Sequence, residues 1–389
     1  MPRIWQDKIK SNMKTVLFIS NVNKANEKDY VSKTDYSVST LIDLPSKVAD
    51  SNGFKCFVGI NRFYASTFDS GCNIEYYNQL IFRNPFNYKE VKRGVKNVED
   101  IIKNNSIDLI FCCTPLGGYA GRILGKKYKI PVVYQVHGFH FYKGAPLLNW
   151  LIYYPIEKRL SKYTDILITI NEEDYNYAKK KFKKVHDLRY IPGIGVDRDN
   201  IATSRKNPQD LRNELGLSKD DYVIISVGYL NRNKNHKVVI DALSKINNPK
   251  IHYLIAGEGD EKEALLKQAK DNHLENNIHL LGYRKDVYDL ISSSDLFVLP
   301  SFREGLPVSV MEAMCLKTMV IASSIRGVNE LLDKNTLFNP KDANDVARAI
   351  SYCMNNDVST SVEANYKRID KYERKNIIKD LTALFEQFK

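Results

Sequence analysis

Two acidic residues, Glu304 and Glu312, flank the start of a predicted helix and offer a pair of carboxylates for binding hydroxyl groups. The apolar run Leu296–Leu299 has the length of a buried parallel strand, and residues 301–307 are predicted to form the loop after it. Beyond that loop, apolar residues recur at spacings of three and four, which predicts a helix with one buried face made by Val308, Met311, Met314 and Cys315.

The start of this helix can hold a phosphate group without a Walker lysine. Its unpaired backbone N–H groups carry roughly half a positive charge, and Gly305 allows a ligand to approach the backbone closely. Eight residues at about 1.5 Å of rise place the two carboxylates on the order of 10 Å apart, which suits the two ends of a nucleotide sugar. The alternative is that Glu304 is an ordinary loop charge and Glu312 a solvated helix position.

The segment 296–314 resembles the E-x7-E motif of the family 4 retaining glycosyltransferases, which have the two-domain fold called GT-B. The resemblance includes the preceding strand, the Glu-Gly-Leu-Pro turn at 304–307 and the Met-Glu-Ala-Met run at 311–314. It implies that Glu304 contacts hydroxyls of the donor sugar and that Glu312 contacts those of the ribose. It also implies that the backbone near the helix start faces the phosphates, at Gly305, Leu306 and Val308.

A basic loop follows the predicted strand Tyr222–Val227. In the family this loop reads Gly-Arg-Leu followed by a lysine, so the resemblance assigns Gly228 and Lys234 to the donor site. Tyr229 replaces the arginine, and Arg232 is expected to take over the second phosphate contact because a guanidinium binds phosphate in a bidentate manner. The alternative is a loop whose basic residues are merely solvated.

The Gly257–Gly259 turn lacks the third glycine of a dinucleotide-binding fingerprint, and a tight turn accounts for it. In similar enzymes this turn and the segment 281–284 line the pocket for the base. The resemblance therefore implies that Tyr283 or Arg284 holds the base.

His137 comes directly after the predicted strand 131–136. The resemblance places it near the anomeric carbon of the reacting sugar, so the expected catalytic residues are His137, Lys234 and Glu304. His140 has no such match, and the alternative for either histidine is a structural residue at a strand end. The run 136–158 resembles enzymes that build bacterial exopolysaccharide and capsule on a lipid carrier. Its apolar part, Leu147–Ile156, is expected at a membrane surface near a polyprenyl-diphosphate acceptor, or else in an ordinary buried helix.

The formal net charge is +12, of which residues 1–200 carry +11. Lysine runs at 126–129 and 179–184 supply much of the excess, and they predict attraction to the anionic inner membrane, at about 1 kcal/mol for each lysine near the surface. The alternative explanation of these runs is composition, because the chain is rich in lysine throughout. No helix-turn-helix, zinc-finger or RNA-binding pattern accompanies the charge, so a nucleic-acid partner is not expected.

Neither a membrane-spanning run nor a signal-peptide core is found, which predicts a cytoplasmic protein peripheral to the membrane. The six cysteines form no C-x-x-C pair, so neither a zinc site nor a disulfide framework is indicated. Asp197-Arg198-Asp199 spells a D-x-D sequence, which in other glycosyltransferases binds a metal, but it lies in the expected linker. A lysine and a helix end would already neutralise the diphosphate, so no metal and no other cofactor is expected.

Strand and helix patterns alternate through two halves of the chain, which predicts an α/β protein with two Rossmann-like, doubly wound parallel sheets facing a ligand cleft. The helical patterns include one at residues 121–128 and a charged, amphipathic one at residues 366–388. Residues 1–13 are a candidate disordered tail, and Asn21–Lys33 lacks the glycine pair that many relatives have after the first strand. The predicted domains are an acceptor-binding domain at 14–193, a hinge at 194–200, a donor-binding domain at 201–368, and a C-terminal helix at 369–389 that packs on the first domain.

The predicted activity is the retaining transfer of a hexosyl or N-acetylhexosaminyl group from a nucleotide-diphosphate sugar to a polyprenyl-diphosphate-linked saccharide, in exopolysaccharide or capsule biosynthesis. Two alternatives are a nucleotide-sugar epimerase of the same architecture and a non-catalytic assembly partner. The second is supported only by the substitution at Tyr229.

Overall fold

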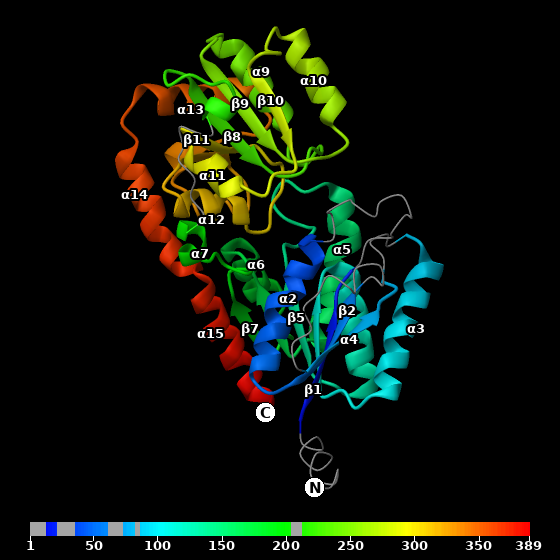
Figure 1. Ribbon diagram of the computed structural model, residues 1–389. Coiled ribbons are helices and arrows are strands. Elements are labelled where there is room, and N and C mark those ends of the chain that lie inside the picture. The colour runs from blue at the N-terminus through cyan, green and yellow to red at the C-terminus, as the bar shows by residue number, and fades with distance from the viewer. Residues whose placement is uncertain (1–12, 22–35, 61–72, 82–85, 204–211) are drawn as a thin grey trace. The chain divides into compact units, whose positions relative to one another are not determined.

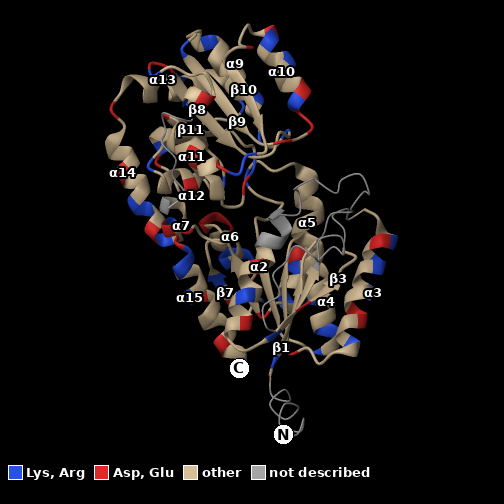
Figure 2. Cartoon of the chain, in the orientation of Figure 1, with Lys and Arg blue, Asp and Glu red and all other residues tan. Residues whose placement is uncertain are grey.

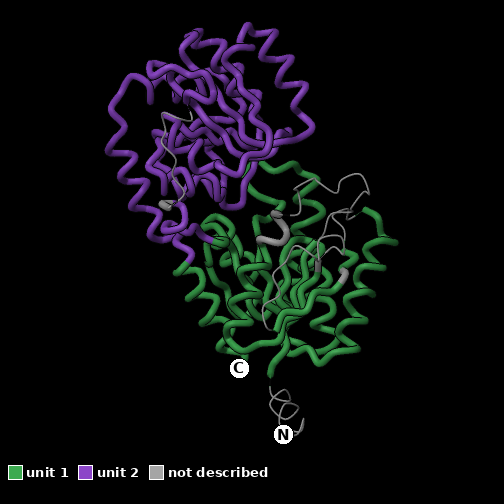
Figure 3. Tube along the Cα trace, viewed as in Figure 1, with its two compact units in different colours: residues 1–194, 375–389 green, residues 195–374 purple. Residues whose placement is uncertain are grey.

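The computed structural model describes residues 13–21, 36–60, 73–81, 86–203 and 212–389. Most of the candidate disordered tail and nearly all of the segment Asn21–Lys33 lie outside these ranges. The chain divides into two compact units, which Figure 3 shows in two colours: unit 1 comprises residues 1–194 and 375–389, and unit 2 comprises residues 195–374. The first predicted domain ends at residue 193, and the first segment of unit 1 ends at 194. The chain was predicted to return to this domain at residue 369, and it returns at 375.

Unit 1 is built on a seven-stranded sheet of order β3-β2-β1-β4-β5-β6-β7, in which every ladder is parallel (Figure 1). The strands are β1 (Thr15–Ile19), β2 (Lys55–Ile60), β3 (Ile74–Asn78), β4 (Leu109–Cys113), β5 (Val132–Val136), β6 (Ile166–Thr169) and β7 (Asp187–Tyr190). The helices are α2 (Tyr36–Ser51), α3 (Tyr88–Asn104), α4 (Pro115–Tyr128), α5 (Leu147–Leu160), α6 (Glu172–Lys181) and most of α15 (Arg374–Phe385).

Helices cover both faces of this sheet, which explains the continuous apolar runs of its strands. Along β1, Val16 and Phe18 face a core shared with α2 and α15. Leu17 and Ile19 face a second core shared with α3, α4 and α6. Because successive side chains of a strand point to opposite faces, both sets must be apolar.

The end of the chain belongs to unit 1 through α15. Phe385 is fully buried, and its ring centroid lies 5.8 Å from that of Phe54 and 6.1 Å from that of Phe111. The sequence predicted one amphipathic helix over residues 366–388, and that prediction is wrong. α14 (Ser359–Arg368) ends before a 3-10 turn (Ile369–Tyr372), because the backbone there pairs with Val196 instead: Val196 N donates to Tyr372 O and Arg374 N donates to Val196 O.

Unit 2 has a six-stranded parallel sheet of order β10-β9-β8-β11-β12-β13. Its strands are β8 (Tyr222–Val227), β9 (Ile251–Ala256), β10 (Ile278–Gly282), β11 (Leu296–Leu299), β12 (Met319–Ser323) and β13 (Leu337–Phe338). Its helices, besides α14, are α7 (Arg198–Thr203), α9 (His236–Ile246), α10 (Lys262–Asp271), α11 (Val287–Ser292), α12 (Val308–Cys315) and α13 (Ala343–Asn355). Two doubly wound parallel sheets confirm the predicted fold class.

The start of α4 differs from the sequence prediction, which began this helix at Gly121. The helix begins at Pro115, and its first turn is rich in glycine because it packs closely. A Cβ added at Gly117 would lie 2.9 Å from Ser20 Cα, and one at Gly118 would lie 2.3 Å from the Tyr134 ring. The glycines therefore mark close packing of the helix rather than a loop.

Candidate functional site

The strand order of unit 2 reverses between β8 and β11, and open parallel sheets bind ligands at the carboxyl ends of the strands at such a point. The loop after β8 carries Gly228 and Lys234, and the loop after β11 carries Glu304 and Gly305. The sheet topology thus brings together two segments that lie far apart in the sequence.

Backbone and side-chain hydrogen bonds of two asparagines hold these two loops against each other. Asn233 O accepts a hydrogen bond from Phe302 N at 2.8 Å, and Asn233 Nδ2 donates to Arg303 O at 2.9 Å. Asn235 adopts the left-handed conformation, with φ at 52°, and its Nδ2 donates to Pro300 O at 3.1 Å. The loop that carries Lys234 is therefore fixed to the loop that carries Glu304.

The side chains of Lys234 and Glu304 form an ion pair, with 2.9 Å between Lys234 Nζ and Glu304 Oε1. Only 20% and 16% of the two side chains are exposed. Gly228 makes room for the lysine stem, since a Cβ there would lie 3.1 Å from Lys234 Cε and the glycine φ is +151°. The reading of Glu304 as an ordinary loop charge does not fit this partly buried pair.

The Gly257–Gly259 turn supports the same loop. A Cβ at Gly257 would lie 1.8 Å from Gly228 O, and one at Gly259 would lie 2.3 Å from Leu230 O. Leu230 N donates to Glu258 O at 2.9 Å. The interpretation as a tight turn was therefore incomplete, because both glycines are needed for the turn to lie against the lysine loop.

Residues 281–284 reach this region through a bridge between Gly257 and Gly282. The Tyr283 side chain is 45% exposed. Arg284 is held by two carboxylates: its Nε donates to Asp286 Oδ1 at 2.8 Å and its Nη1 donates to Glu214 Oε1 at 3.1 Å. These hydrogen bonds raise the pKa of Arg284. Contact of either residue with a base stays a prediction.

The N-terminal turn of α12 presents backbone N–H groups beside Glu304. In the described part of the chain, the amides of Gly305 and Leu306 donate to no other residue. The loop after β12 crosses Gly305, since a Cβ at Gly327 would lie 1.9 Å from Gly305 O. Of the predicted apolar face, Met311, Met314 and Cys315 are buried, whereas Val308 in the first turn is half-buried.

Glu312 is half-buried and accepts a hydrogen bond from the Tyr288 hydroxyl at 3.1 Å. Burial raises the pKa of its carboxyl group, while the Tyr288 hydrogen bond and the charge of Arg374 oppose the rise. Glu312 is therefore not a solvated helix position. Tyr288 could not be singled out from the sequence, because its contact with Glu312 depends on how α11 packs on α12.

Arg232 is not brought to the Lys234–Glu304 pair. Its side chain is 93% exposed, and its Nε lies 3.7 Å from Glu261 Oε1. Tyr229, at the position where relatives have arginine, is held through its backbone: His236 Nε2 lies 3.3 Å from Tyr229 O. The proposed phosphate contact of Arg232 stays a prediction.

A buried polar network that the sequence did not reveal lies beneath this loop. His236 Nδ1 is 2.9 Å from the Tyr253 hydroxyl, which is 2.8 Å from Ser226 Oγ. Burial lowers the pKa of His236 to about 4. At neutral pH this histidine is uncharged and anchors the start of α9.

The Asp197-Arg198-Asp199 segment is engaged in structural contacts. Asp197 Oδ1 accepts from Asn200 N at 3.1 Å, at the start of α7, and Arg198 pairs with Asp370 at 2.9 Å and with Glu373 at 3.2 Å. Within the described ranges, no group of three or more metal-ligating side chains is gathered closely enough to hold a metal ion.

In unit 1, His137 follows β5 and is half-buried. Burial lowers its pKa to about 4, so the imidazole is neutral at neutral pH. Its Nε2 is buried and has no hydrogen-bond partner among the residues that the structure describes, and the same holds for Gln135 Oε1 on β5. The loop after His137 is fixed by Phe139 N, which donates to Asp174 Oδ2 at 3.1 Å. A polar ligand would satisfy these buried atoms.

The sheet of unit 1 has its own reversal point, between β1 and β4. There Asn21 N donates to Thr114 Oγ1 at 2.8 Å, and Asn21 Oδ1 accepts from Gly117 N at 2.9 Å. Asn21 thus caps the glycine-rich start of α4. The available sequence signal was a Thr-Pro-Leu-Gly-Gly run directly after a buried strand.

The apolar segment at 147–156 forms most of α5, and three of its leucines are largely exposed: Leu147 by 73%, Leu148 by 61% and Leu151 by 64%. Trp150 and Tyr154 pack against the core instead. The alternative of an ordinary buried helix is therefore wrong for the leucine face. Over the residues described, no helix is long and apolar enough to cross a membrane.

Two family models match parts of the chain. Residues 207–376 match the family "Glycosyl transferases group 1", and residues 51–171 match "Glycosyl transferase 4-like". EpsD of Bacillus subtilis (strain 168), which is assigned to the glycosyltransferases, is 36% identical over 258 residues, covering 65% of this chain and 68% of EpsD. The UDP-Gal:alpha-D-GlcNAc-diphosphoundecaprenol alpha-1,3-galactosyltransferase of Escherichia coli is 32% identical over 243 residues, covering 60% of this chain and 62% of that enzyme.

Solved structures share the fold over nearly the whole chain. The Anabaena HepE protein in complex with UDP and glucose superposes with a TM-score of 0.73 at 20% identity, covering 96% of this chain and 100% of HepE. Sucrose-phosphate synthase from Thermosynechococcus elongatus gives a TM-score of 0.76 at 17% identity, covering 97% and 99% of the two chains.

Proposed function

This chain belongs to the family 4 glycosyltransferases of GT-B fold, and from that premise we propose that it is a retaining enzyme that transfers a sugar from a nucleotide-diphosphate donor to a lipid-linked saccharide. The observation that supports the proposal best is the Lys234–Glu304 pair, set beside the start of α12 where the strand order of unit 2 reverses.

The donor would bind unit 2 with its diphosphate between Lys234 and the amides of Gly305 and Leu306. These groups would stabilise negative charge as the nucleoside diphosphate departs. Glu304 would accept hydrogen bonds from hydroxyls of the transferred sugar, and Glu312 from those of the ribose. Without donor, Lys234 and Glu304 pair with each other at 2.9 Å. When the donor binds, its diphosphate would pair with Lys234 and its sugar hydroxyls would donate to Glu304.

His137 would contact the transferred sugar as a neutral imidazole, because burial holds its pKa near 4. We assign no protein nucleophile. Lys234 and the helix start supply the positive charge that a divalent metal provides in other enzymes, so the transfer is proposed to need no metal.

The acceptor is proposed to be a saccharide on a polyprenyl diphosphate, in the assembly of exopolysaccharide or capsule. One relative acts, by its name, on a diphosphoundecaprenol-linked sugar. The exposed leucines of α5 give unit 1 an apolar face of the kind that rests on a membrane. The lysine runs at 126–129 and 179–184 of the same unit favour an anionic membrane surface. Figure 2 shows Lys and Arg along α3 and α4, together with Asp and Glu on α3.

A thermal-shift screen against UDP-, GDP-, ADP- and dTDP-sugars would identify the donor, since a ligand at 100 times its dissociation constant adds about 2.7 kcal/mol to the free energy of unfolding. The stabilising donor is then incubated with chemically defined polyprenyl-diphosphate sugars in the presence of EDTA. The expected product is an acceptor heavier by one hexosyl or N-acetylhexosaminyl group, with the anomeric configuration of the donor retained by NMR. An epimerised donor with no acceptor product, or inversion of configuration, would refute the proposal.

A further inference from the structure

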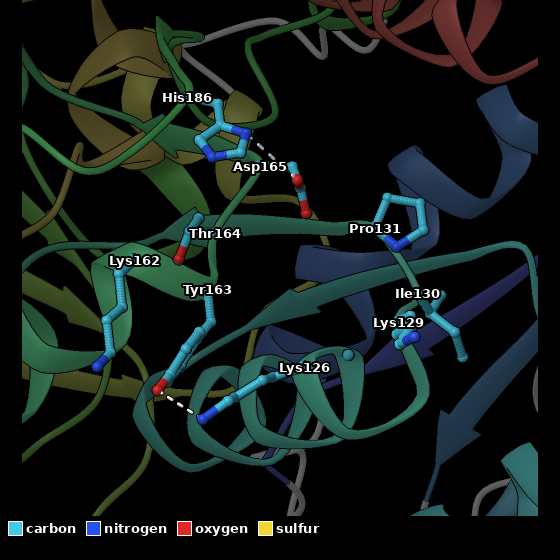
Figure 4. A pocket seen from close by; sticks show the side chains of 10 residues that line it. Lys126, Lys129, Ile130, Pro131, Lys162, Tyr163, Thr164, Asp165 and His186 are labelled. Atoms are coloured by element: carbon cyan, nitrogen blue, oxygen red, sulfur yellow. Dashed lines mark hydrogen bonds and ion pairs between the residues drawn. The ribbon is translucent and has the colours of Figure 1, made fainter.

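Unit 1 has a cavity of about 320 Å³ at the amino-terminal edge of its sheet (Figure 4). It is lined by the end of α4, by the segment 129–131 before β5, by residues 162–165 before β6 and by His186 before β7. The residues that we assign to the sugar and to the reversal point, His137 and Asn21, follow the carboxyl ends of β5 and β1. The cavity is therefore separate from those residues, at the opposite edge of the same sheet.

Three lysines line this cavity: Lys126, Lys129 and Lys162. Among the ion pairs of the described residues, none joins a carboxylate to any of the three. The neighbouring Lys127 behaves differently, because its ammonium pairs with Glu99 outside the cavity. The cavity thus gathers positive charge that the protein itself does not neutralise.

Tyr163 holds two of these ammonium groups close together. Lys126 Nζ donates to the Tyr163 hydroxyl at 2.8 Å, as Figure 4 shows, and lies 4.4 Å from the ring centroid. Lys162 Nζ lies 4.9 Å from the centroid of the same ring. The hydrogen bonds from Lys126 and Lys162 lower the pKa of the Tyr163 hydroxyl. The Tyr163 ring and hydroxyl thus position both ammonium groups without a carboxylate.

One carboxylate, Asp165, is among the lining residues, and its oxygens are engaged. Its Oδ2 accepts a hydrogen bond from Val132 N at 2.7 Å, and its Oδ1 lies 3.6 Å from His186 Nδ1. This carboxylate fixes the start of β5 and does not pair with the three lysines.

Lysines in the last turn of a helix often do no more than complement the helix dipole, and Lys126 lies in the last turn of α4. That explanation does not extend to Lys162, which belongs to the 3-10 turn Ser161–Tyr163. Lys162 nevertheless lies over the same phenol as Lys126. The volume of the cavity is at the lower end of ligand pockets, and it suits one or two phosphate groups better than a whole nucleotide sugar.

We propose that this cavity binds a phosphate group, either free or in the headgroup of an anionic lipid. Lys126 and Lys162 would contact the phosphate oxygens as charge-assisted donors, and Lys129 adds positive charge to the lining. The inference is independent of the proposed donor and acceptor, because it concerns the other edge of the sheet.

The test uses the full chain and two double variants that remove the same charge. Lys126→Gln/Lys162→Gln alters the cavity, and Lys267→Gln/Lys270→Gln alters exposed lysines of α10 in unit 2. Binding of inorganic phosphate and of pyrophosphate is measured by calorimetry. Binding to phosphatidylglycerol vesicles is measured by flotation, with phosphatidylcholine vesicles as the neutral comparison, and thermal unfolding shows whether each variant is folded.

The wild type and the α10 variant are expected to bind alike, and the cavity variant to bind roughly 30-fold more weakly. Binding of the soluble anions by the wild type identifies a free phosphate as ligand, and binding of phosphatidylglycerol vesicles alone identifies a lipid headgroup. Absence of both kinds of binding in the wild type would overturn the proposal. Equal losses in the two folded variants would also overturn it, because they would show attraction by diffuse charge rather than by a site.

Discussion

Lys234 and Glu304, 70 positions apart in the sequence, meet at 2.9 Å where the strand order of unit 2 reverses. Backbone and side-chain hydrogen bonds of Asn233 to the 302–303 segment fix the distance between their loops. The pair is therefore preorganised by the fold and needs no large loop movement to present a cation and an anion to one ligand.

Replacing Tyr288 by Phe removes the hydroxyl that hydrogen-bonds Glu312. Because that hydrogen bond favours the ionised carboxyl, its loss should raise the pKa of Glu312 further. We propose that the ionised carboxylate of Glu312 accepts from the ribose, so donor binding should become roughly fivefold weaker near neutral pH. On acidification, binding by the variant should start to weaken at a higher pH than binding by the wild type. The dissociation constant measured across pH 5–8 tests this. Tyr352→Phe, at an exposed tyrosine of α13, is the control. An unchanged profile for Tyr288→Phe would show that Glu312 does not take part in donor binding.

Arg122 and Glu157 form a bidentate pair in the core of unit 1, at 2.7 and 3.0 Å, and the guanidinium lies 3.9 Å from the centre of the Tyr134 ring. Glu157→Gln leaves a buried cation without its partner and should cost about 3–5 kcal/mol of unfolding free energy. Replacing both residues by apolar ones of similar size should cost less. Urea unfolding measures both, with exposed Arg159→Gln as control. A loss for Glu157→Gln no larger than that of the control would show that the pair is not buried in solution.

His236 should make unit 2 sensitive to mild acid. Its pKa is about 4 in the folded protein against an ordinary 6.5, so the unfolded chain binds the proton more tightly and stability falls as pH drops below 6.5. Between pH 7 and pH 5 the expected loss is about 2 kcal/mol. His236→Gln should remove this loss of unfolding free energy between pH 7 and pH 5. The exposed-site variant His273→Asn should show the same loss as the wild type. Equal slopes for the wild type and His236→Gln would refute the assignment.

The leucine face of α5 should govern membrane binding without affecting donor chemistry. Changing Leu147, Leu148 and Leu151 to Ser removes the exposed apolar surface and should weaken partition into anionic vesicles by about tenfold or more. Donor binding to the variant should match the wild type. Leu266→Ser, at an exposed leucine of α10, is the control. Unchanged partition of the triple variant would place the membrane contact elsewhere.

The parallel strands were predictable because both of their faces are buried, which leaves short continuous apolar runs such as Leu296–Leu299 and Tyr222–Val227. Both runs form strands with the predicted bounds. The start of α4 was missed because its glycines resemble a loop when their neighbours across the sheet are unknown. The break after α14 was missed because it depends on pairing with Val196, more than 170 residues earlier.

In the candidate site, residue types and spacing drew attention to Glu304 and Glu312, and the resemblance to the family assigned their roles and that of Lys234. Their partners could not be predicted, since Tyr288 and Asn233 are common residues whose roles depend on how loops pack. The position of Arg232 could not be predicted either. Its charge suggested a phosphate contact, but the side chain extends into solvent. Family membership does not decide which of these residues touch the donor.

The most direct test of the account is the binding and turnover of the donor, identified by thermal shift, in Lys234→Gln and Glu304→Gln proteins. Lys237→Gln, an exposed lysine of α9, is the matched control. The account predicts that both site variants stay folded and lose more than about 100-fold in turnover, while the control keeps wild-type activity. Wild-type binding and turnover in both site variants would contradict it.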